Sequence, residues 1–221
     1  MAERRWCRPC ALRWQRTPDH QASPLGYRGC IEDSCPSWEN EIPLRYRNAT
    51  LADLPESLKE QFLALSDDRG MLLWGPPGRG KTHAMCAFAK HLWAEGWSFR
   101  RITYEQLCLD IRATFGKGDG ESELAIVEPL WEIPKLFIED VGVTVSLGQQ
   151  ESDFSLRTLV TLLDQRLEWC RATFVTSNKS VEELARSFDE RVASRLCQAC
   201  EIIQITGEDK RRSVSSGNEL H

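Results

Sequence analysis

The sequence lacks the features that mark a membrane protein, a secreted protein or a strongly basic one. No apolar run approaches the roughly 18 residues that a membrane span needs, and no apolar segment follows the Arg-rich start as it would in a secretory signal. Positive charge is not in excess either, since the net charge is −5 and the isoelectric point is near 5.5. We therefore expect a cytoplasmic protein that does not coat duplex DNA through bulk charge.

Internal repeats are absent as well, and the composition is that of an ordinary soluble protein. The 221 residues are 41% hydrophobic and 28% charged, which is sufficient for one well-packed domain with a small appendage.

The clearest motif is the run from Gly75 to Thr82, which matches G-x-x-x-x-G-K-[ST]. It follows an apolar stretch at 71–74, so it lies where a strand would meet a helix. Glycines allow backbone N–H groups to face phosphate oxygens, Lys81 would reach the β- and γ-phosphates, and the Thr82 hydroxyl would ligate Mg²⁺. A Gly/Pro-rich surface turn that meets the pattern by chance is disfavoured by this context. The predicted phosphate-binding loop comprises Gly75, Pro76, Pro77, Gly78, Arg79, Gly80, Lys81 and Thr82, with His83 next to it.

Strand-like and helix-like patterns alternate along the chain after the first 55 residues. Such alternation predicts an α/β domain with a central, mainly parallel sheet flanked by helices. Strands are expected at 71–74, 98–102, 136–138, 172–176 and 202–205. Helices are expected at 82–95, 104–115, 121–130, 156–167, 181–188 and 190–196, and a polar loop at 142–152.

A second group of candidate residues follows two of these strands. Glu139 and Asp140 end an apolar strand, where one carboxylate would hold the Mg²⁺ shell and the other would orient and deprotonate the attacking water. Adjacent acids in a solvated turn are the alternative. Asn178 ends another strand and would reach the γ-phosphate or that water, although Asn also favours helix N-caps and turns.

Two arginines, Arg191 and Arg195, lie four residues apart and therefore on one face of the expected helix. An arginine offered to the phosphates of a neighbouring subunit would stabilise the charge that develops during phosphoryl transfer. The alternative is a surface pair bridged to Glu190 or Asp189.

The first 40 residues are rich in Cys, Pro, Arg and Trp and show no sustained periodicity. Four of the nine cysteines lie there as C-x2-C followed by C-x4-C, a pattern close to that of a four-thiolate zinc site. Zn²⁺ would fold a segment too poor in apolar side chains to build a core. The predicted zinc ligands are Cys7, Cys10, Cys30 and Cys35, with His20 as a substitute for one thiolate.

The start of the chain also interleaves arginines with Trp6 and Trp14, which suits either single-strand binding or a solvated arm. Cys197 and Cys200 form another C-x2-C pair, but no second pair lies near them, so we expect them to be packing residues.

Together these segments resemble the DnaC/DnaI/IstB group of AAA+ ATPases over about residues 41–212. The segments that carry the resemblance are the phosphate-binding loop through His83, Glu139-Asp140-Val-Gly142, Thr176-Ser-Asn178, Arg191-Val-Ala-Ser-Arg-Leu196, Gly207-Glu-Asp-Lys-Arg211, the lead-in at 42–50 and the helix start at 104–107.

The resemblance implies an assembly-dependent ATPase that helps to place a DnaB-like replicative helicase on single-stranded DNA and that self-associates through its ATP site. Gly75, Gly80, Lys81 and Thr82 would form Walker A, Glu139 and Asp140 would form Walker B, Asn178 would be sensor 1, Arg195 or else Arg191 the arginine finger, and Arg211 sensor 2. Thr82 and Glu139 would hold Mg²⁺. The family pattern has Asp as the first Walker B acid, so this chain departs from it, and ATP binding is better supported than fast hydrolysis.

The expected domains are a zinc-binding, partner-binding module at 1–40, a linker at 41–55, the ATPase domain at 56–207 and a flexible tail at 208–221. Alternatives to a helicase loader are an IstB-like helper ATPase for transposition, a nucleotide-gated adaptor with little hydrolysis, and a small-molecule P-loop kinase.

Overall fold

A computed structural model describes residues 38–114, 123–142 and 153–209. Several predictions concern residues outside these ranges and stay predictions: the zinc ligands Cys7, Cys10, Cys30 and Cys35, the substitute ligand His20, the sensor 2 candidate Arg211, and most of the expected loop and tail.

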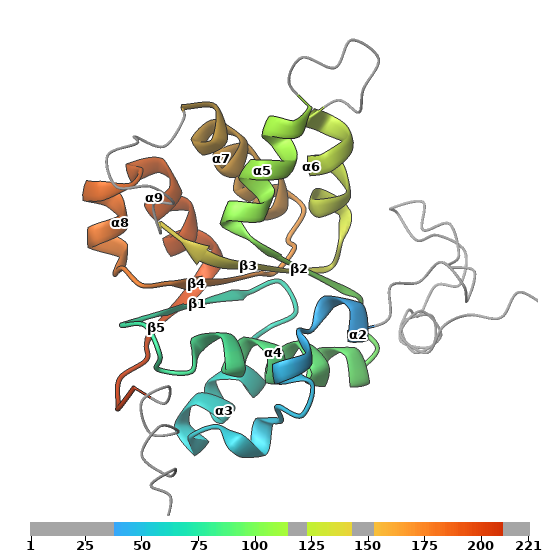
Figure 1. Ribbon diagram of the computed structural model, residues 1–221, viewed down its shortest axis with the longest axis vertical. Coiled ribbons are helices and arrows are strands. Elements are labelled where there is room, and N and C mark those ends of the chain that lie inside the picture. Colours follow the sequence, from blue (N-terminus) through green and yellow to red (C-terminus); the bar gives the residue numbers. More distant parts are fainter. Residues whose placement is uncertain (1–37, 115–122, 143–152, 210–221) are drawn as a thin grey trace, which may run out of the picture.

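Five strands form one sheet in the order β2-β3-β4-β1-β5, and each pair of neighbouring strands is parallel (Figure 1). The predicted parallel α/β fold is therefore confirmed, and each expected strand overlaps an observed one. The strands are β1 (Gly70–Trp74), β2 (Phe99–Thr103), β3 (Lys135–Val141), β4 (Thr173–Ser177) and β5 (Cys200–Gln204).

Helices cover both faces of the sheet, with α3 and α4 on one side and α5 to α9 on the other (Figure 1). The α-helices are α2 (Trp38–Glu41), α3 (Glu56–Leu63), α4 (Lys81–Ala94), α5 (Tyr104–Ala113), α6 (Glu123–Glu132), α7 (Asp153–Glu168), α8 (Val181–Ser187) and α9 (Glu190–Ala199). Two short 3-10 helices are η2 (Leu44–Tyr46) and η3 (Leu51–Asp53).

The interior strand β1 lies between β4 and β5, and its sequence is an unbroken apolar run at 71–74. Successive side chains on a strand face opposite sides of a sheet. Leu72 packs in the core beneath α5 to α9, whereas Met71 and Leu73 pack in the core beneath α3 and α4. Because helices cover both faces, all three side chains are fully buried, and no polar alternation is possible.

Residues 41–55, which the sequence suggested as a linker, pack against the sheet and α4. Ile42 and Ala49 are buried and Leu54 nearly so, all in the core on the α4 side. Lys90 of α4 donates hydrogen bonds to the carbonyl oxygens of Arg47 and Ala49, the second at 2.8 Å. This segment is therefore held by apolar burial and by a lysine from the helix that it contacts.

Arg166 of α7 is a fully buried arginine whose guanidinium hydrogen-bonds a hydroxyl and backbone carbonyls. The group donates to the Thr173 hydroxyl at 2.9 Å and, at 2.7–2.8 Å, to backbone carbonyls in the last turn of α6, the α6–β3 connection and the α7–β4 connection. Burial lowers the pKa of Arg166 to about 9, which leaves the group charged at neutral pH. Arg166 therefore joins two connections at the amino-terminal edge of the sheet.

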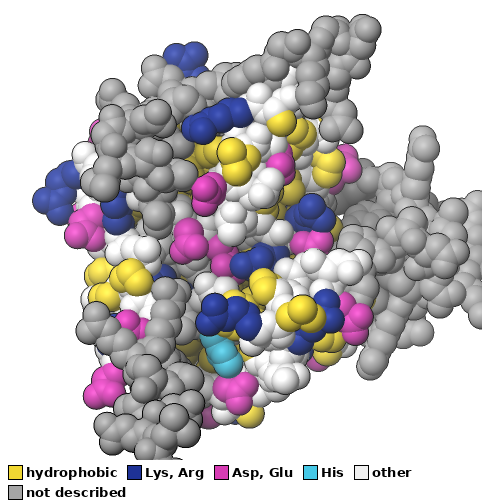
Figure 2. All heavy atoms as spheres, in the orientation of Figure 1, with side chains coloured by type: hydrophobic (Ala, Val, Ile, Leu, Met, Phe, Trp, Pro, Cys, Tyr) yellow, Lys and Arg dark blue, Asp and Glu magenta, His cyan; other side chains and the backbone are white. Residues whose placement is uncertain are grey.

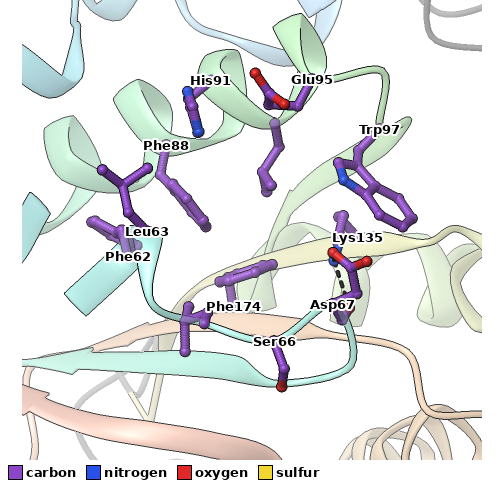
Figure 3. Close-up of a pocket in the computed structure, with 12 residues that line it drawn as sticks. Phe62, Leu63, Ser66, Asp67, Phe88, His91, Glu95, Trp97, Lys135 and Phe174 are labelled. Carbon is purple, nitrogen blue, oxygen red and sulfur yellow. Dashed lines mark hydrogen bonds and ion pairs between the residues drawn. The ribbon is translucent and has the colours of Figure 1, made fainter. Parts of the chain in front are cut away.

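A cavity of about 160 Å³ lies at the same amino-terminal edge, between α3, α4 and the strands (Figure 3). Phe62, Phe88 and Phe174 form its apolar wall, and the ammonium group of Lys135 lies 4.2 Å from the centre of the Trp97 ring. Ligand pockets usually measure about 300–1,000 Å³. This cavity is smaller than that, so we place the functional site elsewhere.

Within the described ranges no helix is both long enough and apolar enough to cross a membrane. Cys86, Cys108 and Cys200 are buried, whereas Cys170 and Cys197 are exposed. The expectation that Cys197 is a packing residue is therefore wrong, because it lies on the outer face of α9. Cys200 begins β5 and donates its S–H to the Thr173 carbonyl at 3.2 Å.

Candidate functional site

The loop between β1 and α4 has the backbone of a tight phosphate-binding turn. Gly75, Gly78 and Gly80 have φ values of 144°, 79° and 92°, which non-glycine residues rarely adopt. A Cβ atom at Gly75 would lie 2.3 Å from the Ile205 carbonyl oxygen, so only glycine fits beside the chain that leaves β5. α4 begins at Lys81, and its first N–H groups have no partner within the helix. The amino-terminal end of α4 therefore offers backbone N–H donors and the positive end of the helix dipole to an anion.

Lys81 lies inside this loop rather than in solvent. Its side chain is 6% exposed, and Nζ donates to the carbonyl oxygens of Gly75 at 2.6 Å and Pro76 at 2.9 Å. Nζ also donates to Oδ1 of Asn178 at 2.8 Å, just after the end of β4. The structure thus joins two residues that the sequence proposed separately. The helix N-cap alternative for Asn178 is wrong, because Ser180 caps α8.

Thr82 and Glu139 meet at the carboxyl ends of β1 and β3. The Thr82 hydroxyl donates to Oε2 of Glu139 at 3.1 Å, and Glu139 is 2% exposed. A threonine hydroxyl and a carboxylate beside a phosphate-binding loop are oxygen ligands of the kind that Mg²⁺ prefers. Mg²⁺ usually keeps several waters and uses few protein ligands. Among the described residues, no three His, Cys, Asp or Glu side chains form a cluster that could hold a metal ion.

The two adjacent acids do not lie side by side. β3 continues past both of them to Val141, and its pairing with β4 is irregular between Ile138 and Val141. Within this bulge Asp140 has a φ of +58° and is exposed, and its N–H donates to the Thr176 hydroxyl at 3.0 Å. Glu139 therefore faces Thr82, while Asp140 faces solvent.

The bulge also gives a physical reason for the Glu-Asp order. Asp and Asn tolerate the left-handed conformation better than other non-glycine residues, which favours Asp over Glu at position 140. The longer side chain of Glu139 reaches from inside the strand to Thr82 of α4 and to Arg101 of β2.

Arg101 is a site residue that sequence reasoning missed. It lies on β2, and its Nε and Nη2 donate to Oε1 and Oε2 of Glu139 at 2.7 and 2.8 Å. Desolvation opposes the charge of Arg101, but the hydrogen bonds and charge of Glu139 outweigh it, so the pKa of Arg101 is raised. The partners are 38 residues apart in the sequence, so no local pattern marks the pair.

Cys86 on α4 lies close to this ion pair. Burial first, and then the charge of Glu139, raise the pKa of its thiol to about 12. Because the thiolate is the reactive form, Cys86 is an inert packing residue of the site.

The two arginines of α9 each have an acidic partner within the chain. Arg191 contacts Asp189 at 2.9 Å between Nη2 and Oδ2, as the surface-pair alternative predicted. Nε of Arg195 donates to Oδ1 of Asp164 on α7, and both side chains are about one-third exposed. Arg195 is therefore tethered to a neighbouring helix but still reachable from outside.

His83 follows the phosphate-binding loop in sequence but points away from the candidate site. His83 faces η2 and η3, with Nε2 3.6 Å from Oδ2 of Asp53 and its ring edge-on to Tyr46. Pro76 and Pro77 are exposed, and Arg79 is half-buried. The structure thus brings Lys81, Thr82, Glu139 and Asn178 together, and it directs His83 away from them.

The chain that leaves β5 passes over the phosphate-binding loop. Ile205 N–H donates to the Trp74 carbonyl at 2.7 Å, and a Cβ atom at Gly78 would lie 1.9 Å from Oδ1 of Asp209. The segment that begins at Gly207 is therefore close to the loop. Its arginine candidate, Arg211, lies outside the described residues.

The surface in Figure 2 carries basic and acidic side chains intermixed, with hydrophobic side chains only in small clusters between them.

Comparison with known proteins places this geometry in context. The family model described as IstB-like ATP binding protein matches residues 54–217. The chain is 29% identical over 145 residues to the replicative helicase loader DnaC of Escherichia coli strain K12, which corresponds to 66% of this chain. It spans 57% of the length of that relative.

Two solved structures are similar in fold. The crystal structure of the DnaC helicase loader matches with a TM-score of 0.63 at 19% identity, covering 74% of this chain and 100% of that one. The crystal structure of DnaI matches with a TM-score of 0.61 at 20% identity, covering 75% and 95%.

Proposed function

The chain belongs to the IstB-like ATP binding protein family, and from this premise we propose that it is an ATPase that loads a replicative DNA helicase onto single-stranded DNA. The curated relatives that bear the name replicative helicase loader support this choice. The observation that carries the proposal is the assembly of Lys81, Thr82, Glu139 and Asn178 at one edge of the sheet. These residues come from three neighbouring strand ends, which is where ligands bind in open α/β sheets.

Each residue has a distinct role in this proposal. Lys81 exchanges its carbonyl acceptors for phosphate oxygens when ATP enters the loop, and Asn178 senses that movement because it shares a hydrogen bond with Lys81. Thr82 and Glu139 would hold Mg²⁺, which when bound neutralises phosphate charge. Asp140 would accept a proton from the attacking water, which can reach it because its side chain is exposed.

Arg195 is the residue that would act on a neighbouring subunit. Its contact with Asp164 occupies the guanidinium in the single chain. In an assembly the phosphates of the adjacent subunit compete with Asp164 for the same donors, which couples hydrolysis to self-association. Arg191 is the second choice, because its contact with Asp189 lies within its own helix start.

The remaining segments complete the proposal. Residues 56–207 form the ATPase domain, and residues 1–40 form a zinc-binding module that engages the helicase. Arg211 contacts nucleotide as sensor 2. Metal analysis of the purified chain tests the zinc module directly, and a protein without zinc would contradict the proposed zinc site.

The loading reaction is the experiment that tests the whole proposal. The protein is mixed with a hexameric DnaB-type helicase, circular single-stranded DNA and ATP, and the helicase retained on the DNA is measured together with phosphate release. We expect ATP-dependent retention and DNA-stimulated hydrolysis for the wild type. Arg195→Ala should reduce the hydrolysis rate by about 1,000-fold, as expected for an arginine finger.

Arg186→Ala is the matched control, since Arg186 is an exposed arginine on the adjacent helix α8. It should leave both measurements unchanged. If a pull-down with this protein captures a transposase instead of a helicase, the transposition helper is favoured. If the protein binds ATP but its hydrolysis stays negligible in the presence of both helicase and single-stranded DNA, the nucleotide-gated adaptor is favoured.

Asp140→Asn tests the proposed base separately from binding. Asparagine keeps the size of the side chain and tolerates the left-handed backbone, but it accepts no proton. We expect the turnover number to fall by about 100-fold while the dissociation constant for ATP changes by less than about threefold. Single-turnover hydrolysis and nucleotide titration measure the two quantities, and an unchanged turnover number would assign the base to another group.

A further inference from the structure

Arg101 is a charged residue of the site to which the proposed function gives no role. Its guanidinium binds both carboxylate oxygens of Glu139, at 2.7 and 2.8 Å. The side chains of Arg101 and Glu139 are 16% and 3% exposed, so solvent screens the pair little. A bidentate arginine–carboxylate pair of this geometry is among the stronger polar contacts in proteins.

The position of Arg101 is fixed from the other side of the strand by Glu41 of α2. Oε2 of Glu41 accepts the backbone N–H of Arg101 at 2.8 Å, and its Oε1 accepts from Nη1 of Arg100 at 2.7 Å. Adjacent strand residues direct their side chains to opposite faces. The neighbouring arginines therefore serve different carboxylates, Arg100 that of Glu41 and Arg101 that of Glu139.

We propose that Arg101 is a built-in counter-ion for Glu139 and that it competes there with Mg²⁺. This rests on the ATP·Mg²⁺ site of the proposed function. A buried carboxylate is costly unless a positive charge faces it, and Arg101 supplies that charge before any metal binds. The Thr82 hydroxyl, at 3.1 Å from the same carboxylate, shows that the pair lies directly beside the phosphate-binding loop.

The charge of Arg101 has opposite effects on the two ligands. Without metal it cancels the charge of Glu139, so the loop accepts a triphosphate without repulsion from a bare carboxylate. With metal it faces a second cation at the same carboxylate, and like charges repel. Arg101 is thus a positioning residue that makes nucleotide affinity less dependent on Mg²⁺.

Titration of a fluorescent ATP analogue, mant-ATP, in EDTA and in excess MgCl₂ tests this inference. The quantity of interest is the ratio of the dissociation constants without and with Mg²⁺. In Arg101→Gln we expect this ratio to rise by about tenfold relative to the wild type, because removal of one close charge weakens metal-free binding and strengthens Mg²⁺ binding. The Mg²⁺ concentration for half-maximal binding should fall accordingly.

Arg100→Gln is the matched control, because it removes an arginine from the same strand without touching Glu139. Its ratio should equal that of the wild type. A ratio that is unchanged in Arg101→Gln, or that rises equally in both variants, overturns the inference. If Arg101→Gln does not fold, as judged by its thermal melting, Arg101→Lys decides, since lysine keeps the charge but loses the bidentate contact and should give an intermediate ratio. If the wild type binds no mant-ATP under either condition, the proposed function fails instead.

Discussion

Replacing Lys81 by alanine is expected to lower the affinity for ATP by about 100-fold, corresponding to about 3 kcal/mol. Lys81 supplies the one lysine ammonium group within the phosphate-binding loop, and its contacts at 2.6–2.9 Å with two loop carbonyls and Asn178 hold it there before nucleotide enters. The variant loses both the charge and the group that links the loop to β4. Isothermal titration with ATP and Mg²⁺ measures the change.

Lys90→Ala is the control for this experiment. Lys90 belongs to the same helix and also donates to two backbone carbonyls, but those carbonyls belong to the lead-in segment. We expect it to lower the stability of the fold while leaving ATP affinity within about twofold of the wild type. Equal losses of affinity in the two variants would mean that helix α4, and not the Lys81 ammonium, determines binding.

Replacing Arg166 by methionine is expected to lower the free energy of unfolding by about 4 kcal/mol, out of a total of about 5–15 kcal/mol for a domain. Methionine fills similar space, so the main loss is hydrogen bonding. The carbonyl oxygens of Leu130 and Ile133, which are buried and partly buried, would lose the donor that now lies 2.7–2.8 Å from them, whereas the Ala172 carbonyl would keep the Leu136 N–H at 3.2 Å. Leaving buried polar groups unpaired costs about 1–3 kcal/mol each. Urea denaturation followed by circular dichroism measures the change.

Arg171→Met is the control, since Arg171 is a half-buried arginine of the same region that donates to the Trp131 carbonyl. We expect a loss of about 1 kcal/mol for it. Arg166→Lys separates charge from geometry, because a lysine keeps the charge but has fewer donors, and it should be nearly as destabilised as the methionine variant. Full stability of Arg166→Lys would show that charge alone is required.

The parts of the site that the sequence predicted are those that depend on neighbours in the chain. The loop through Thr82 is recognisable because glycine, lysine and threonine must follow one another at fixed spacing. Glu139 and Asn178 were predictable because each comes at or beyond an apolar strand, and parallel strands bring their carboxyl ends to one edge.

The parts that were not predicted depend on partners distant in sequence. Arg101 meets Glu139 only because β2 and β3 are neighbours in the sheet, and Arg166 meets its carbonyls only after two connections have folded against α7. For Arg166 a weak signal existed, since it follows Leu163 by three residues and so continues the apolar stripe of that helix. The bulge at Asp140 left no signal in the apolar pattern, because the strand continues through it.

The contact between α2 and β2 has a further consequence for one open edge of the sheet. β2 is the outermost strand beyond β3, and the outward N–H of Arg101 is accepted by the carboxylate of Glu41 instead of another strand. Open sheet edges are the usual route by which separate molecules add strand to strand and aggregate. By covering this edge with a short helix and an acceptor, the fold blocks the pairing of a further strand with β2.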